Sequence, residues 1–377
     1  MICTSVFAFT AALLAPAIAA PIVVRTDSLS NSTGMVTSNA TAHAGFSYGA
    51  FWPKDESPKT YEDFLRLFNQ AKSLPGTSVS FNSARLFQTA QWQKPTEPSE
   101  AFKAAIETET TLLLGLWLSA MPTELEALNA AFETHGQKLA DLVVGISVGN
   151  EDIYRTSPEC AKHNDNQPCP MQATPEEVKS NVTAVRDAMK QWDHLFKAPP
   201  PIGHTDVAQF AAQDGLDFIG TTVYPFWGNE PIDKAQESTA KTLAEVAKNA
   251  SDKPIWITET GWPSSGKEEG TGSGSVDDMR KYWVDVGCQA FGKQNIWWFQ
   301  LEKDTLDDFD WGILDPATKK PKFDLGCPGS SASAQSASSP SEVHISRASD
   351  QPRLLDRNNF FENARIGLHK TFVEWRK

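Results

Sequence analysis

Residues 255–263 read IWITETGWP, an apolar run that ends in Glu259 and is followed by a Gly-Trp-Pro turn. A second segment of the same design, VVGISVGNE at residues 143–151, ends in Glu151. Short runs of β-branched and aromatic residues next to Gly and Pro are typical of buried strands. Each segment therefore predicts a strand that delivers a carboxylate at its carboxyl end.

Six further strands are expected along the chain, with helical stretches between them. The eight expected strands are 45–50, 79–88, 111–118, 142–149, 201–207, 216–224, 254–258 and 295–301. The expected helices include 61–73, 124–135, 175–190, 235–249 and 276–291. This alternation indicates an α/β protein with a closed (β/α)8 TIM barrel. An open doubly wound sheet is the alternative, but no Gly-x-Gly-x-x-Gly follows an expected strand.

The two ends of the chain differ from the barrel in composition. An apolar run from Val6 to Leu14, followed by Ala17-Ile18-Ala19, predicts a cleaved signal peptide, with a buried N-terminal helix as the alternative. Ser and Ala dominate after Cys327, and the last residues lack the apolar run of a lipid-anchor signal. The chain is thus divided into a signal peptide (1–20), an N-terminal extension (21–44), a single catalytic barrel domain (45–327), a Ser/Ala-rich linker (328–341) and a polar tail of unknown role (342–377).

The cysteines also favour export. Cleavage after residue 20 removes Cys3 and leaves an even number of cysteines, which suits an oxidising compartment. The short loop favours pairing of Cys160 with Cys169, and Cys288 would then pair with Cys327. A zinc site is the competing interpretation, but no Cys-x-x-Cys supports it. Glycosylation sequons at Asn31, Asn39, Asn181 and Asn249 agree with a secreted, extracellular or cell-wall protein.

Charge and aromatic content restrict the class of partner. The formal net charge of −13 argues against nucleic acid, because phosphate binding needs a concentrated Lys/Arg surface. Twelve tryptophans exceed what packing usually requires and suggest a sugar ligand. We therefore expect a neutral polysaccharide as partner, no transmembrane segment and a monomeric protein.

The two glutamates suit glycoside hydrolysis. The carboxyl ends of all strands of a barrel open onto one face, so Glu151 and Glu259 can meet although they lie far apart in the sequence. This reaction uses two carboxyl groups, and a separation of roughly 5 to 5.5 Å leads to a covalent intermediate and retention of configuration. For a single glutamate, a surface position or an ion pair would be the alternative.

Several blocks of sequence resemble glycoside hydrolase family 17. They are Gly-Asn-Glu at 149–151, Thr-Glu-Thr-Gly-Trp-Pro at 258–263, and the blocks 45–49, 282–288 and 295–299, which are most similar to fungal secreted β-1,3-glucanases of that family. The resemblance covers residues 45–327. It implies a retaining hydrolase of cell-wall β-1,3-glucan, with Glu151 as general acid and then base, Glu259 as nucleophile, and no metal or cofactor.

The resemblance also implies roles for neighbouring residues. Asn150 occupies the place of an amide that binds the sugar 2-OH, and Arg85 that of an arginine that keeps the nucleophile ionised, with a core salt bridge as the alternative. Tyr224 ends its strand where it could donate to Glu259. Tyr48, in the block 45–49, is a further expected substrate-binding residue.

Four tryptophans divide into two groups by strand alternation. Trp262 and Trp298 lie at or just after strand ends and are expected to stack on glucose rings, with a place in the core as the alternative. Trp256 and Trp297 point the other way and are expected in the core.

The sequence departs from the family at two places. FQTAQ at 87–91 replaces the Tyr-x-x-Asp-Cys often seen in fungal relatives, and Gln300, Glu302 and Asp304 compete for the polar positions after the last strand. Linkage preference and endo or exo action therefore stay open. So do two alternative functions, a β-glucan transglycosylase that uses the same intermediate and an inactive wall-binding protein.

Overall fold

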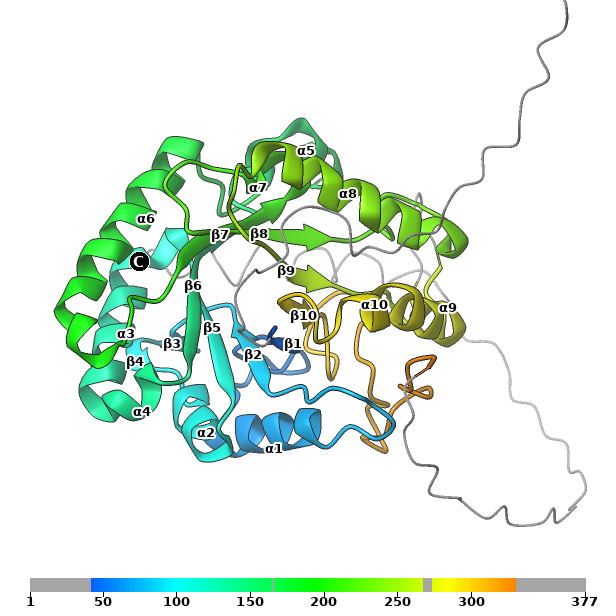
Figure 1. Cartoon of the computed structure of the whole chain (residues 1–377), viewed down its shortest axis with the longest axis horizontal. Helices are drawn as coiled ribbons and strands as arrows, with labels where there is room; N and C mark the ends of the chain where they lie inside the picture. The colour runs from blue at the N-terminus through cyan, green and yellow to red at the C-terminus, as the bar shows by residue number, and fades with distance from the viewer. Residues whose placement is uncertain (1–41, 165, 267–272, 330–377) are drawn as a thin grey trace, which may run out of the picture.

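In the computed structural model, which describes residues 42–164, 166–266 and 273–329, eight parallel strands close into a barrel (Figure 1). The strands are β1 (Ala44–Tyr48), β2 (Ser83–Leu86), β5 (Thr111–Leu116), β6 (Val143–Asn150), β7 (Ile202–Val207), β8 (Phe218–Val223), β9 (Ile255–Thr260) and β10 (Ile296–Trp298). They follow one another around the barrel in chain order, and β10 pairs with β1. The predicted TIM barrel and all eight of its strands are confirmed.

Helices surround the barrel, as Figure 1 shows. They are α1 (Tyr61–Lys72), α2 (Ala101–Thr108), α3 (Met121–His135), α4 (Gln137–Ala140), α5 (Pro158–His163), α6 (Pro175–Met189), α7 (Ala208–Ala211), α8 (Ala235–Asn249), α9 (Val276–Tyr282) and α10 (Cys288–Ala290). Capping boxes at Thr60 and Thr174 fix the starts of α1 and α6. The five expected helices are confirmed, although a π-helical turn, Trp283–Gly287, interrupts the last one between α9 and α10.

A small hairpin beside the barrel was not expected from the sequence. Strands β3 (Ala90–Gln91) and β4 (Lys94–Pro98) pair antiparallel between β2 and α2. Strand β4 reads KPTEP, and its side chains are exposed or half-buried. The sequence does not predict this strand, because it has two prolines and no apolar face. Proline is tolerated in a strand only where that edge of the strand needs no further pairing.

The barrel is filled at the end where its strands begin. The inner side chains there are Leu113, Phe218, Trp256 and Trp297. Trp256 stacks on Phe218 with ring centroids 3.8 Å apart, and Trp297 donates its indole N–H to Ser83 at 3.1 Å. At Gly145 a Cβ would lie 2.8 Å from the Trp256 ring, so only glycine leaves room for it. The predicted core positions of Trp256 and Trp297 are confirmed.

Two disulfides, Cys160–Cys169 and Cys288–Cys327, confirm the predicted pairing and exclude a zinc site at these cysteines. None of the helices in the described part of the chain has the length and apolar run needed to cross a membrane. The signal peptide, nearly all of the N-terminal extension and of the linker, the polar tail, and the sequons at Asn31 and Asn39 lie outside the described residues.

Candidate active site

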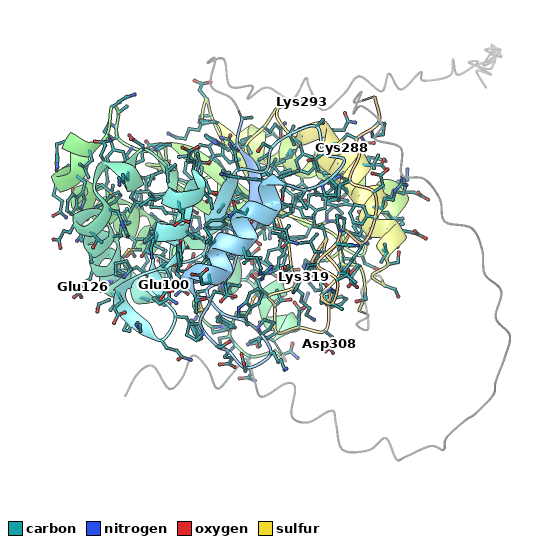
Figure 2. All side chains as sticks on the ribbon, turned by 90° about the horizontal axis from the view of Figure 1, so that it is seen from below. Glu100, Glu126, Cys288, Lys293, Asp308 and Lys319 are labelled. Atoms are coloured by element: carbon teal, nitrogen blue, oxygen red, sulfur yellow. A yellow bond between two sulfur atoms is a disulfide. The ribbon has the colours of Figure 1, made fainter. Side chains whose placement is uncertain are left out.

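All eight strands are parallel, so their carboxyl ends open onto one side of the barrel, and two labelled residues locate this side in Figure 2. Lys293, which precedes β10, is at the upper edge of this view, and Asp308, which follows β10, is at the lower edge. Both sequence-predicted glutamates lie at the carboxyl ends of strands. Glu259 is the fifth residue of β9, and Glu151 directly follows β6.

Glu259 is held by two donors, one on strand β2 and one directly after strand β8. The Arg85 guanidinium donates to Oε1 at 2.6 Å, and the Tyr224 hydroxyl donates to Oε2 at 2.9 Å. Arg85 and Glu259 are only 1% and 6% exposed. Burial, together with the negative charge of Glu259, raises the pKa of Tyr224 well above 10, so its hydroxyl stays a donor. The two donors therefore stabilise Glu259 as a fixed carboxylate.

Arg85 also connects this carboxylate to Asn150. Its second terminal nitrogen donates to Asn150 Oδ1 at 2.7 Å, so one guanidinium joins β2 to both β9 and β6. Because the amide oxygen of Asn150 accepts from Arg85, its amide nitrogen is the end that can donate to a ligand. The expected contacts of Arg85 and Tyr224 with Glu259 are present in the structure, whereas the expected bond from Asn150 to a sugar 2-OH stays a prediction.

Glu151 lies on a tight turn at the end of β6. Gly149 has φ 81° and Glu151 has φ 57°, a region that residues other than glycine seldom occupy. The Glu151 N–H donates to the Thr205 carbonyl at 2.8 Å, which anchors the turn to β7. The hydroxyl of Thr222 donates to Glu151 Oε1 at 2.9 Å. Thr222 is also the register partner of Glu259, so it brings the two carboxyl groups to neighbouring positions.

The surroundings of Glu151 favour its protonated form. Burial is the main cause, and the negative charge of Glu259 adds to it, so the pKa of Glu151 rises from 4.5 to about 7. Arg155 and the Thr222 hydroxyl act in the opposite direction. At neutral pH this carboxyl group can therefore both release and accept a proton.

A buried His-Asp pair supports the Glu151 turn and was not predicted from the sequence. Asp206 Oδ2 accepts from the N–H groups of Ile153 at 3.0 Å and Tyr154 at 3.4 Å, and it lies 3.2 Å from His204 Nε2. Burial opposes a charge on His204, but Asp206, Asp152 and the Val148 carbonyl together outweigh it and raise the His204 pKa above 6.5. The signal in the sequence was the run of three polar residues, His204 to Asp206, inside the buried strand β7.

Three predicted sugar-binding residues do not face the site. Trp298 is 0% exposed and packs under the helices against Tyr282 and Trp283. Trp262 is 3% exposed and packs against Phe226 and Tyr282. These positions correct the prediction that the two indoles stack on glucose.

Tyr48 is buried as well, and its ring packs edge-on against Phe68 of α1. The outward alternation of β1 therefore turns this side chain away from the barrel interior. The expectation that Tyr48 binds substrate is wrong for this arrangement.

Other aromatic side chains form a group beside the two donors to Glu259 instead. Phe87, Trp117 and Phe299 are half-buried, and each is the first residue after its strand. The Phe87 and Trp117 rings are nearly parallel, with centroids 6.3 Å apart, and Phe299 lies 6.1 Å from Tyr224. The expected strands 79–88, 111–118 and 295–301 run past these positions, so the sequence placed the three aromatics within strands and did not mark them as site residues.

A fourth aromatic lies farther out, on the turn after β8. Trp227 is 42% exposed, and its ring packs against Phe226, Phe309 and Trp311. Trp311 in turn lies 5.4 Å from Tyr224. Aromatic side chains thus connect the surface at Trp227 with the donor to Glu259.

The polar residues after β10 are occupied by structural contacts. Asp304 accepts from the fully buried Lys59 at 2.7 Å and also bonds with Gln300. Glu302 pairs with Arg66 and Lys319. In the ranges that the structure describes, no group of three or more His, Cys, Asp or Glu residues is arranged to hold a metal ion.

Comparisons with known proteins identify relatives among the glycoside hydrolases. A model of the BtgE/BtgC glycoside hydrolase domain matches residues 45–309. The probable glucan endo-1,3-beta-glucosidase eglC of Aspergillus fumigatus is 38% identical over 314 residues, which cover 79% of this chain and 68% of that protein. The protein of the same name from Aspergillus niger is 37% identical, with 79% and 66% covered. The chain thus spans about two thirds of the length of these relatives.

Among solved structures, the glycoside hydrolase family 17 beta-1,3-glucanosyltransferase from Rhizomucor miehei superposes with a TM-score of 0.61 at 20% sequence identity. The superposition covers 76% of this chain and 98% of that one. At this identity the likeness concerns the fold, and it agrees with the barrel described above.

Proposed function

Because this chain belongs to the BtgE/BtgC glycoside hydrolase domain family, we propose that it is a retaining hydrolase of β-1,3-glucan, with Glu259 as nucleophile and Glu151 as acid and base. One observation carries the proposal: two neighbouring carboxyl groups have opposite surroundings. Glu259 accepts from Arg85 and Tyr224, whereas the surroundings of the half-buried Glu151 raise its pKa to about 7. Glycoside hydrolysis needs one ionised and one protonated carboxyl group at the start.

In the first step, a Glu259 oxygen attacks the anomeric carbon while Glu151 gives its proton to the glycosidic oxygen. The bond between the anomeric carbon and that oxygen breaks, and the leaving sugar departs with the proton. The loss of this proton leaves Glu151 as a carboxylate. A glycosyl ester on Glu259 is the product retained by the enzyme.

In the second step, the Glu151 carboxylate takes a proton from water, whose oxygen attacks the anomeric carbon and releases Glu259. Two inversions give net retention. We assign to Asn150 a hydrogen bond from its amide nitrogen to the sugar 2-OH, because its oxygen is engaged by Arg85. Such a bond strengthens in the transition state.

We assign sugar contacts to the half-buried aromatics Phe87, Trp117 and Phe299, since aromatic faces pack well on the C–H faces of glucose. The preference for β-1,3 linkages rests on the names of the Aspergillus relatives. We also propose a secreted or cell-wall protein that acts as a monomer. Two disulfides support an oxidising compartment.

Incubation of the protein with laminarin tests the proposal. We expect shorter sugars whose anomeric configuration is retained, as NMR at early reaction times would show. Glu259→Ala should produce none. Parallel β-1,6 and mixed-linkage glucans should be cleaved more slowly. Products longer than the substrate would favour the transglycosylase, and binding without any new product would favour an inactive wall-binding protein.

A further inference from the structure

Glu124 is a buried carboxylate that the reaction above does not use. It lies in the first turn of α3 and is 2% exposed. Its Oε2 accepts from the N–H of Thr89 at 2.7 Å, the N–H of Ala90 at 3.2 Å and the hydroxyl of Thr89 at 2.6 Å. A backbone hydrogen bond from Trp117 further stabilises its charge.

These donors belong to the two segments that carry the aromatic pair. Thr89 is two residues beyond Phe87 in the segment after β2, and Trp117 directly follows β5. Glu124 therefore connects both segments to the start of α3. Burying a carboxylate is costly, and burial raises the pKa of Glu124 to about 7 despite these hydrogen bonds. An apolar residue would fill the position but leave the backbone donors without a partner.

The segment after β2, residues 87–91, also contacts the donor to the nucleophile. The Arg85 guanidinium lies 4.6 Å from the centroid of the Phe87 ring and donates to Glu259. The far end of the segment is held as well, because Gln91 donates to the Lys59 carbonyl and accepts from the Glu100 N–H, both at 2.9 Å. The departure from the family pattern at residues 87–91 thus lies in a segment held at Glu124 and at Gln91.

We propose that Glu124 is a positioning residue that fixes the Phe87 and Trp117 rings relative to each other. It thereby determines how much kcat/KM increases with the length of the glucan chain. This inference rests on the proposed function. It assigns to Glu124 no contact with the substrate. Arg85 is held by Glu259 and Asn150 without any contact to Glu124, so the cleavage of short substrates should be largely independent of Glu124.

The test compares kcat and KM on laminarioligosaccharides of three and six glucosyl units. Glu124→Gln should reduce kcat/KM about tenfold on the hexaose, mainly through KM, and change it less than about twofold on the triose. Glu126→Gln is the matched control, because Glu126 is exposed on the same helix and lies at the edge of the molecule in Figure 2. It should behave like the wild type on both substrates.

A second pair of variants tests the inference independently, in case Glu124→Gln does not fold. Thr89→Val removes the hydroxyl that bonds to Glu124, and Thr89→Ser keeps it, so only the valine should lower the preference for the hexaose. Phe87→Leu should lower that preference as well. An equal loss on both substrates, or no loss with either Glu124→Gln or Thr89→Val, would overturn the inference. Failure of the wild type to cleave either sugar would instead overturn the proposed function on which it rests.

Discussion

The turn after β6 and the end of β9 each present a glutamate, yet their surroundings differ in almost every respect. Glu259 lies within a regular strand and receives charge-assisted bonds from Arg85 and Tyr224. Glu151 lies on a turn with positive φ and receives one hydroxyl bond, from Thr222. The first region stabilises a negative charge, and the second disfavours one.

This difference shows that side-chain identity does not decide which carboxyl group attacks and which transfers a proton. The neighbours decide it, because strong donors lower the free energy of a carboxylate, while burial beside another negative charge raises it. Replacing either glutamate, or the donors that distinguish them, should therefore impair different steps of the reaction.

The largest effect is expected for Glu259→Ala, which removes the attacking oxygen. The value of kcat/KM on laminarin should fall by at least about 10⁴-fold. Azide can then attack an activated aryl β-glucoside from the open face, with Glu151 intact, and the product should be the α-glycosyl azide. Analysis of the azide product by NMR checks this, and a β-azide would contradict the assignment of Glu259.

Glu151→Ala should be less severe, with a loss of about 10²- to 10⁴-fold on glucan, because only proton transfer is lost. A dinitrophenyl leaving group needs no protonation, so the glycosyl-enzyme should still form and accumulate. Added azide should restore turnover and give the β-glycosyl azide. If NMR showed an α-azide for this variant, the roles of the two glutamates would have to be exchanged.

Tyr224→Phe tests the donor side of the comparison, because it removes one of the two bonds to Glu259 while keeping the ring. A hydrogen bond to a charged group contributes about 1.5 to 3 kcal/mol, so kcat/KM should fall about ten- to hundredfold. Tyr61→Phe is a matched control, because the Tyr61 hydroxyl also donates to a glutamate, Glu107. Tyr61 begins α1, and this hydrogen bond lies at the surface. Equal activities of the two variants would show that the bond to Glu259 is unimportant.

The smallest effect is expected for Thr222→Val, which removes the donor to Glu151. This donor lowers the pKa of Glu151 from what burial alone would give, so its removal should raise that pKa further. Because Glu151 must be protonated in the first step, the alkaline limb of kcat/KM should move upward by about one pH unit. Thr222→Ser keeps the hydroxyl and should leave the limb in place, and a downward shift with valine would contradict the assignment.

Much of the molecule follows from local sequence. Apolar runs and their spacing predicted the eight strands, and the parallel order then followed because a closed barrel brings all strand ends to one face. The same rule predicts from the sequence that Glu151 and Glu259 lie close together. The short Cys160–Cys169 loop made the disulfide pairing accessible as well.

Other features depended on contacts that no local pattern encodes. Trp298 and Tyr48 pack against helices rather than facing the site, because a strand's alternation gives two faces but not which one turns inward. The hydrogen bonds from Arg85 to Glu259, from Thr222 to Glu151 and from Thr89 to Glu124 join residues on different elements. The sequence by itself determined the barrel and its two glutamates. Only the tertiary structure decided their different hydrogen-bond partners and which aromatics lie near them, because both depend on neighbours brought together by closure of the barrel.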